Sequence, residues 1–324
     1  MALNPGYNSA GLNISGQFGM PLYGIQGTTQ PFTGNYFWVN PTGGSDGNTG
    51  GPQDPFATLT QALLKCTAGN NDVVFLTGTY NPTATVAWNK NNTHLIGLSP
   101  QGPGVGTANI QPASLTATSG AFTPLVNVTA SGCIFQDIGA ISGIAQATTQ
   151  VTWAEAGGNN SYINCDFSQV GNATAAAQAG TSALTIASAG CYFGNCAIGG
   201  DSIVRATNAN VTVQFLAGMG STIFDNCIFA MWSSVAGNTH ITAAATTFTG
   251  YALLRNCILI NDISNTGYVA NSAAIVNSGT SGGVIVLNQD TTVLGATAVA
   301  TTGPVYGSGA VPSATTSNLA IALT

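Results

Sequence analysis

Four stretches in the second half of the chain repeat one pattern of apolar and polar positions. Each has a large apolar residue, a variable residue, Asn, Cys, a second variable residue and another large apolar residue, at 162–167, 193–198, 224–229 and 254–259. The alternation on both sides of the Asn-Cys pair has a period of two, which predicts β-strands. The cysteines at 165, 196, 227 and 257 are separated by 31, 31 and 30 residues. A fixed period of this size indicates a solenoid, a propeller or another repeat array.

The chemistry of the repeat favours a β-solenoid. Asn tolerates the left-handed backbone conformation, so each Asn-Cys pair suits a sharp bend between two strands. Stacked coils would place the asparagines about 4.8 Å apart, where their amides can hydrogen-bond along the stack. The cysteines would form a second ladder of small hydrophobic side chains that face the core. The two predicted ladders are Asn164, Asn195, Asn226 and Asn256, and Cys165, Cys196, Cys227 and Cys257.

An earlier region resembles a known family. Its predicted elements are a strand (36–40), a turn-rich loop (41–54), a short helix (near 55–66) and a buried strand (72–80). Asp54 is placed to cap the helix. This order resembles the opening of right-handed parallel β-helix proteins of the pectate-lyase-like superfamily, and the Asn-Cys copies resemble that family's asparagine-ladder turn. The resemblance spans roughly residues 36–295. It implies an all-β, right-handed parallel β-helix with a short N-terminal capping helix.

The chain divides into three parts on this interpretation. Residues 1–35 contain no charged side chain and are rich in Gly and Asn, which predicts an extended N-terminal arm. Residues 36–295 form the β-helix. Residues 296–324 are also uncharged and rich in Thr, Val and Ala, which predicts a β-prone C-terminal tail. We expect both ends to pack on a neighbouring subunit or on the side of the solenoid.

Composition excludes several classes of partner. Only 4% of the 324 residues are charged, with 4 Lys and Arg against 10 Asp and Glu and a net charge of −6. An average soluble domain has about 25% charged residues. So few cations cannot neutralise a row of phosphates, so we expect no nucleic acid and no anionic membrane surface as a partner. No apolar run reaches the roughly 18 residues of a membrane span, and the first residues show no secretion signal.

The cysteines and histidines do not suggest a metal or a disulfide framework. There are seven cysteines, an odd number, and no C-x-x-C pair. With only two histidines, His94 and His240, the chain lacks the ligand spacing of a zinc site. We therefore expect buried free thiols, no metal and no cofactor.

Candidate catalytic groups are sparse. Enzymes of the superfamily that the chain resembles cut acidic polysaccharides with clustered carboxylates, or with a base and bound Ca²⁺. The best constellation here is Asp225 and Arg255, both two positions before a ladder cysteine on successive coils, with Asp262 a few residues beyond. These residues could supply a base and a carboxylate in a groove. We favour a lateral ion pair on the surface, and hence no catalytic residue.

A second group of side chains is a candidate interface. It consists of Trp153, Met231 and Trp232 together with Ile228 and Ile258, which have outward parity. An apolar patch of this kind on adjacent coils marks an interaction surface. Irregular packing at the turns is the alternative explanation.

These features predict a structural protein. β-Helix folds are common in bacteriophage tailspikes, fibres and capsid decoration proteins, usually as trimers. We therefore expect a non-enzymatic capsid decoration or head-associated protein, made in the host cytoplasm. It would form a homotrimer in the virion and contact the major capsid protein or other virion subunits. The alternative is an extracellular polysaccharide-degrading or glycan-binding protein of the tailspike or depolymerase type, acting as a lyase or a glycoside hydrolase.

Overall fold

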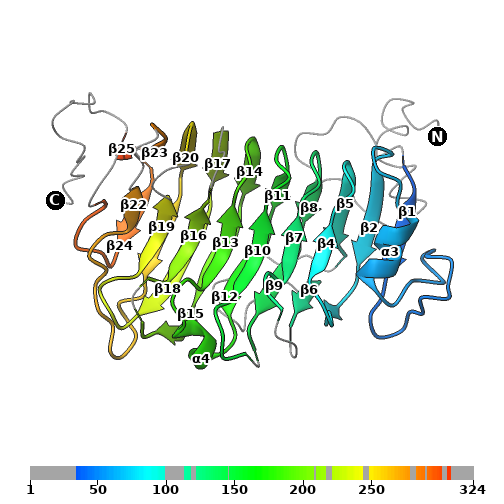
Figure 1. Cartoon of the computed structure of the whole chain (residues 1–324), viewed down its shortest axis with the longest axis horizontal. Coiled ribbons are helices and arrows are strands. Elements are labelled where there is room, and N and C mark those ends of the chain that lie inside the picture. Colours follow the sequence, from blue (N-terminus) through cyan, green and yellow to red (C-terminus); the bar gives the residue numbers. More distant parts are fainter. Residues whose placement is uncertain are drawn as a thin grey trace, which may run out of the picture.

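Each Asn-Cys repeat forms one coil, in which a strand, a two-residue corner and a second strand are followed by a loop and a third strand. The computed structural model describes residues 34–98, 113–117, 122–144, 146–207, 209–216, 221–243, 248–277, 282–288, 290–300 and 305–307. Within these residues, successive coils stack along the long axis of the molecule (Figure 1). The chain is a right-handed parallel β-helix, as the sequence predicts.

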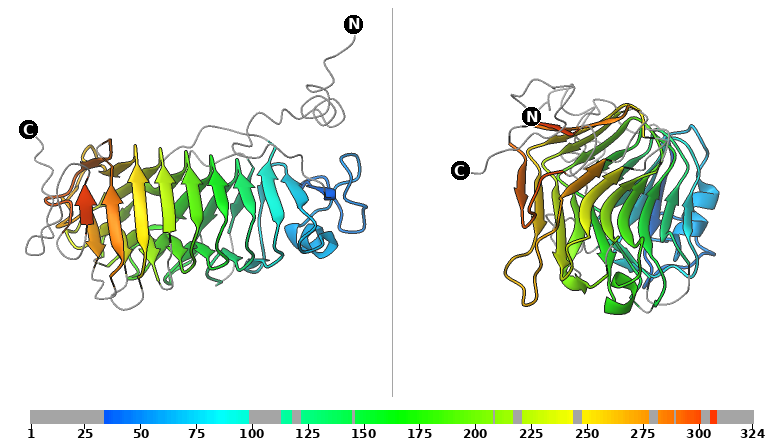
Figure 2. Two further views of the ribbon diagram at one scale, coloured as in Figure 1. Left: turned by 90° about the horizontal axis from the view of Figure 1, so that it is seen from above. Right: turned by 60° about the vertical axis from the view of Figure 1, so that its left-hand side comes forward.

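Three parallel sheets run the length of the described part of the rod, and Figure 2 shows them from two further sides. The ten-stranded sheet contains β1 (Tyr36–Val39), β2 (Asp72–Leu76), β5 (Thr93–Gly97), β8 (Ile134–Gln136), β11 (Ser161–Ile163), β14 (Cys191–Gly194), β17 (Ser221–Asp225), β20 (Tyr251–Arg255), β23 (Val284–Leu287) and β25 (Val305–Gly307). The eight-stranded sheet contains β3 (Thr79–Tyr80), β6 (Ser114–Thr116), β9 (Gly139–Ser142), β12 (Asp166–Val170), β15 (Ala197–Arg205), β18 (Ile228–Ser233), β21 (Ile258–Asn261) and β24 (Thr292–Leu294). The seven-stranded sheet contains β4 (Val86–Trp88), β7 (Val126–Val128), β10 (Val151–Glu155), β13 (Ser182–Ile186), β16 (Val211–Phe215), β19 (Thr239–Ala243) and β22 (Ile275–Asn277).

An aromatic stack runs through the core beneath the ten-stranded sheet. Tyr162 pairs in register with Phe193, and Phe193 pairs with Phe224. Their ring centroids are 4.6 and 4.8 Å apart, close to the spacing of the strands. All three side chains are fully buried. Because a slip of one residue would turn these rings outward, the stack specifies the register of the coils.

The predicted capping helix is α3 (Leu59–Lys65), and it starts later than expected. Its N-cap is Thr58, whose Oγ1 accepts a hydrogen bond from the Gln61 N–H at 3.1 Å. Asp46 from the preceding loop accepts hydrogen bonds from the Ala57 and Thr58 backbone N–H groups at 3.0 and 2.9 Å. The expectation that Asp54 caps the helix is therefore wrong, because Asp54 accepts from Thr49 instead. The helix covers the end of the core with buried apolar residues, among them Leu59 and Leu63.

The end of the chain adds to the solenoid as far as it is described. β25 pairs with β23 and extends the ten-stranded sheet, and Ala296 and Ala300 form bridges to Asn271 and Ile275. Nearly all of the predicted arm, residues 1–33, lies outside the described residues, as do residues 301–304 and 308–324. A second short helix, α4 (Ala173–Ala176), lies in the loop after β12. Neither described helix has the length and hydrophobicity required to cross a bilayer.

Candidate functional site

The Asn-Cys pairs make the sharp corners between the ten-stranded and the eight-stranded sheets. We call these corners, residues 164–165, 195–196, 226–227 and 256–257, the ladder corner. The four asparagines have φ angles of 53°, 54°, 55° and 50°, in the left-handed region. In the preceding coil Asp137 takes the same position with φ of 56°, and the Asn164 amide donates to its carboxylate.

The asparagine amides are bonded along the stack. Asn226 Nδ2 donates to Asn195 Oδ1 at 2.6 Å, and Asn256 Nδ2 donates to Asn226 Oδ1 at 3.0 Å. Asn226 and Asn256 are exposed, and Asn195 is half-buried. Each carboxamide has two N–H groups and two lone pairs, so the bonded row retains donors and acceptors that face solvent.

The cysteines on the other side of each corner face the core. The thiols of Cys196 and Cys227 donate to the carbonyls of Tyr162 and Phe193 at 3.5 and 3.3 Å. All four cysteines are buried and free. Burial raises the pKa of the Cys196 thiol well above its usual value, so this cysteine is not a thiolate nucleophile near neutral pH.

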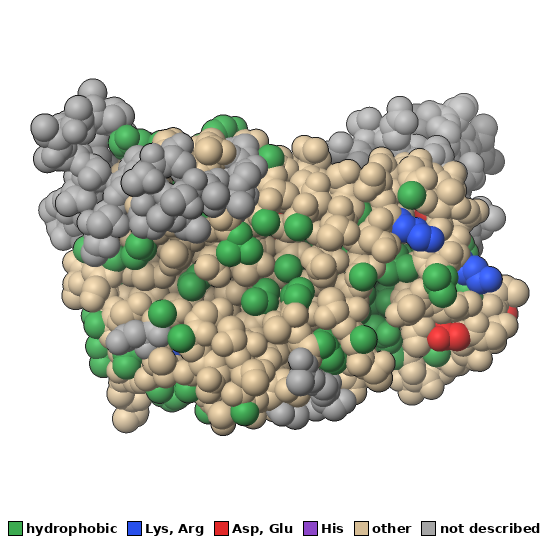
Figure 3. Space-filling model, in the orientation of Figure 1, with side chains coloured by type: hydrophobic (Ala, Val, Ile, Leu, Met, Phe, Trp, Pro, Cys, Tyr) green, Lys and Arg blue, Asp and Glu red, His purple; other side chains and the backbone are tan. Residues whose placement is uncertain are grey.

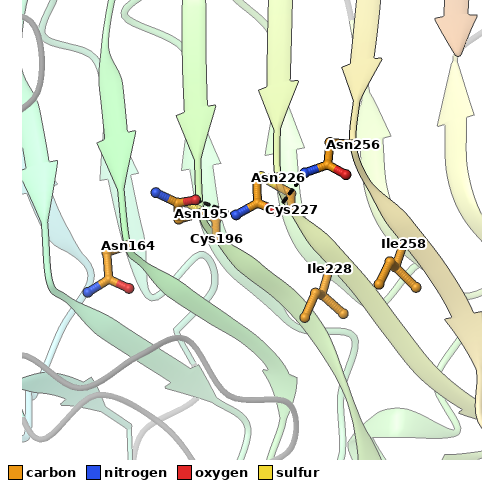
Figure 4. Close-up of a pocket in the computed structure, with 8 residues that line it drawn as sticks. All are labelled: Asn164, Asn195, Cys196, Asn226, Cys227, Ile228, Asn256 and Ile258. Carbon is orange, nitrogen blue, oxygen red and sulfur yellow. Dashed lines mark hydrogen bonds between the residues drawn. The ribbon is translucent and has the colours of Figure 1, made fainter. Parts of the chain in front are cut away.

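A shallow groove follows the ladder corner along the rod (Figure 4). Its volume is about 350 Å³, in the range of sites that hold small ligands. The four ladder asparagines form one row, and Ile228 and Ile258 lie beside them on the same side (Figure 4). Cys196 and Cys227 complete the lining. None of these lining residues is charged.

Asp225 and Arg255 directly precede the groove-lining residues Asn226 and Asn256 in the chain, although neither lines the groove itself. They end β17 and β20 and pair in register, and Arg255 Nη2 donates to Asp225 Oδ2 at 2.8 Å. The side chains are 33% and 42% exposed, respectively. The predicted lateral ion pair is confirmed. At this exposure it contributes at most about 1 kcal/mol to stability.

A tyrosine that sequence reasoning missed completes the cluster. The Tyr192 hydroxyl donates to Asp225 Oδ2 at 3.3 Å. Gly194, which is in register with Asp225, makes this contact possible because a Cβ there would lie 2.8 Å from the Tyr192 hydroxyl. Burial, with the nearby Asp225 charge, raises the pKa of Tyr192, so its phenol remains a hydrogen-bond donor. Gly194, a glycine in an otherwise apolar strand, is the feature of the sequence that could have indicated this contact.

Asp262 does not join this cluster. It follows β21, which starts at the ladder corner, so Asp262 lies at the opposite edge of the eight-stranded sheet. Its carboxylate accepts from Ser264 N–H at 2.8 Å and from Asn265 Nδ2 at 2.6 Å. The nearby carboxyl is that of Asp201, whose pKa is raised by burial and further by the charge of Asp262. The proposed grouping of Asp262 with Asp225 and Arg255 is therefore wrong.

Two of the five interface candidates are not on the surface. Trp153 and Met231 are fully buried, Trp153 because it points inward from β10 into the aromatic core. Trp232 and Ile228 are half-buried, and Ile258 is 40% exposed. The structure thus retains only Ile228, Trp232 and Ile258 as surface candidates, and two of them line the groove.

The histidines do not provide acid–base groups near neutral pH. Burial lowers the pKa of His94 to about 4. Burial, together with the Arg205 charge, lowers the pKa of His240 to about 3. His94 Nδ1 accepts from the Ile134 N–H at 3.0 Å, so its Nε2 carries the proton and faces Asn71 Oδ1 at 2.7 Å. Among the described residues, no three His, Cys, Asp or Glu side chains are grouped as metal ligands would be.

Comparison with known proteins gives structural neighbours only. No protein-family model and no curated protein matches the sequence. Two crystal structures of the Aspergillus niger pectin methylesterase, in deglycosylated and penultimately deglycosylated form, are similar with TM-scores of 0.53 and 0.52 and 12% and 13% identity. In both cases 86% of this chain and 85% of the esterase chain are covered. The pectate lyase Pel9A has a TM-score of 0.47 at 12% identity, covering 87% of this chain and 82% of the lyase.

The two esterase structures support the parallel β-helix fold and contradict the predicted function. We expected a non-catalytic bacteriophage capsid protein, and the similar structures are polysaccharide-processing enzymes instead. The bacteriophage link has no support among them. The expected homotrimer and the expected absence of nucleic acid and membrane partners stay predictions. The chain shares with the A. niger pectin methylesterase the architecture of a parallel β-helix, at an identity that establishes the fold alone.

Proposed function

We propose that this protein is a polysaccharide-processing enzyme that hydrolyses an ester carried by a glycan in the ladder groove. The observation that carries the proposal is the cluster of Asp225, Arg255 and Tyr192 beside a groove lined by amides and two isoleucines. The comparison also supports it. The A. niger pectin methylesterase has the same β-helix architecture, and its name describes an esterase that acts on a polysaccharide.

Asp225 is the proposed general base. Its Oδ2 accepts hydrogen bonds from Arg255 and Tyr192, which hold the carboxylate in one orientation. Among the described residues nothing donates to the other oxygen, Oδ1, so that oxygen is available to a water molecule. A positioned carboxylate that removes a proton from water contributes typically 10²- to 10⁴-fold to a hydrolytic rate.

The remaining groups suit the charge that develops on an ester carbonyl. Attack by water on the carbonyl carbon produces a negatively charged oxygen. The Arg255 guanidinium is permanently charged, and only its Nη2 is bonded to Asp225. The exposed Asn226 amide lies in the adjacent row. As the intermediate collapses, the ester C–O bond breaks and the leaving alcohol takes the proton that Asp225 had accepted.

The geometry favours ester hydrolysis over glycoside hydrolysis and over the lyase reaction, the two alternatives that the sequence suggests. Glycoside hydrolysis uses two carboxyl groups that flank the bond. The recorded partners of Asp225 within the described residues are a guanidinium and a phenol. A lyase needs an unprotonated base, and the guanidinium of Arg255 is ion-paired with Asp225.

The test is release of the esterified group. Methyl-esterified and acetylated polysaccharides would be incubated with the protein, and released methanol or acetate measured. Asp225→Asn should lower the rate by about 100-fold or more, because the amide cannot accept the proton. Asp54→Asn is the matched control, since Asp54 is a carboxylate in the loop near α3. No release from any ester, or full activity in Asp225→Asn, would contradict the proposal.

A further inference from the structure

The row of amides in the groove repeats once per coil. Asn195, Asn226 and Asn256 present the same carboxamide at successive corners, joined by hydrogen bonds of 2.6 and 3.0 Å. Adjacent strands in a sheet are about 4.8 Å apart, and this is the interval between rungs. Figure 4 shows the row running across the strands, along the axis of the rod. A ligand that uses every rung must therefore repeat at the same interval.

The isoleucines beside the row repeat in the same way. Ile228 and Ile258 pair in register as the first residues of β18 and β21. Ile258 is 40% exposed, so much of its side chain is accessible to a ligand. The groove thus combines a polar edge with an apolar floor, the combination that suits the hydroxyl rim and the C–H face of a sugar ring.

The electrostatics of the groove select against a polyanion. Its lining is uncharged, and the adjacent Asp225 and Arg255 cancel. The chain as a whole has a net charge of −6. A polymer with one carboxylate per sugar would find no cation in the lining to pair with each carboxylate. Figure 3 shows one face of the molecule as mostly uncharged, with the clearly visible Lys and Arg side chains near the end that holds α3.

We propose that the substrate is an extended, uncharged polysaccharide that lies parallel to the solenoid axis, with successive sugars in register with successive coils. This inference rests on the proposed function, because it names the polymer for the same groove. The amides of the ladder bond the hydroxyl groups of each sugar, and Ile228 and Ile258 pack against the ring faces. The Asp225–Arg255 cluster then meets a substituent on the sugar at that rung.

The test measures binding separately from turnover. The Asp225→Asn variant would be titrated by calorimetry with uncharged β-1,4-linked oligosaccharides of increasing length and with oligogalacturonate of the same lengths. We expect the affinity for the uncharged series to rise with each added sugar until the ladder is spanned, and oligogalacturonate to bind at least about tenfold more weakly. Tighter binding of oligogalacturonate, or an affinity that does not grow with length, would overturn the inference.

A pair of substitutions locates the binding site. Ile258→Glu places a carboxylate on the groove floor and should weaken uncharged oligosaccharides by about tenfold. Leu64→Glu is the matched control, because Leu64 is 68% exposed on α3 at the end of the rod and should leave binding unchanged. Equal losses in both variants, or none in Ile258→Glu, would overturn the inference. If binding grows with length but no ester is released, the proposed reaction is wrong, whereas the inference that the groove binds an uncharged polysaccharide stands.

Discussion

The two corners of the eight-stranded sheet satisfy their polar groups in opposite ways. At the ladder corner two residues suffice in each coil, and the asparagine amides bond one another at the surface. At the other corner, which we call the loop corner, the segments that join the eight-stranded sheet to the seven-stranded sheet differ in length. Residues 206–210 form a short one and residues 262–274 a long one. Here polar side chains are buried and each finds a different set of partners.

Arg205 illustrates the loop corner. It is fully buried and donates to Thr212 Oγ1 at 3.1 Å and to the Ala230 carbonyl at 3.3 Å. Burial lowers the pKa of Arg205 to about 9, because the protein groups around the guanidinium replace only part of the hydration that its charge has in water. A repeated corner can reuse one solution, whereas a variable corner needs a separate solution in each coil. The same substitution should therefore cost more at the loop corner than at the ladder corner.

The largest effect is expected at Asn261, a buried asparagine at the loop corner. Its Oδ1 accepts from the Ser233 N–H at 2.9 Å, and its Nδ2 donates to Asn271 Oδ1 at 2.8 Å and to the Val269 carbonyl at 2.9 Å. Asn261→Ala leaves these groups without partners in the interior and should lower the free energy of unfolding by about 3 kcal/mol. Urea denaturation at neutral pH measures this. A cost no greater than that of Asn226→Ala would remove the distinction between the corners.

An intermediate effect of opposite sign is expected at Asp166, an exception at the ladder side. Asp166 begins β12, is in register with Ala197 and is fully buried. Among the described residues only Ser168 Oγ donates to its carboxylate, at 3.2 Å. Burial raises its pKa well above the usual value. The folded state thus holds a proton that the unfolded state loses above about pH 4. The free energy of unfolding therefore falls as the pH rises from about 4 towards the raised pKa of Asp166 in the folded state.

Asp166→Asn removes this linkage. The variant should be more stable than the wild type at pH 7, and the advantage should shrink towards pH 4, below which the wild-type carboxyl is protonated in both states. Thermal unfolding followed across this pH range would show it. Destabilisation at pH 7 would mean that the ionised carboxylate is the native form.

The smallest effect is expected at Asn226 on the exposed ladder. Asn226→Gly keeps a residue that adopts a φ of 55° without strain and loses only surface hydrogen bonds to two neighbouring rungs. Asn226→Ala adds the cost of the left-handed conformation, about 1 kcal/mol. Comparing the two variants by urea denaturation isolates the backbone contribution. Equal stability of the two would show that the corner does not demand this conformation.

The site was only partly accessible from the sequence. The position of Asp225 and Arg255 two residues before the ladder cysteines was enough to predict their pairing, because register carries from coil to coil. The contact of Tyr192 was not predicted, since it depends on how a ring folds over Gly194. Trp153 was expected at the surface, but its ring packs between Phe135 and Phe167 in the core. Asp262 was grouped by sequence proximity, and the direction of β21 carries it away.

The sequence by itself determined the coil. A strict recurrence of Asn-Cys between alternating apolar residues specifies both the left-handed corner and the face that packs inward, because these depend on local conformation and on a period of two. Outside that repeat, only the tertiary structure decided which side chains are neighbours. The groove, the phenol on Asp225 and the buried polar groups of the loop corner arise from lateral stacking of coils, and a single coil does not contain that information.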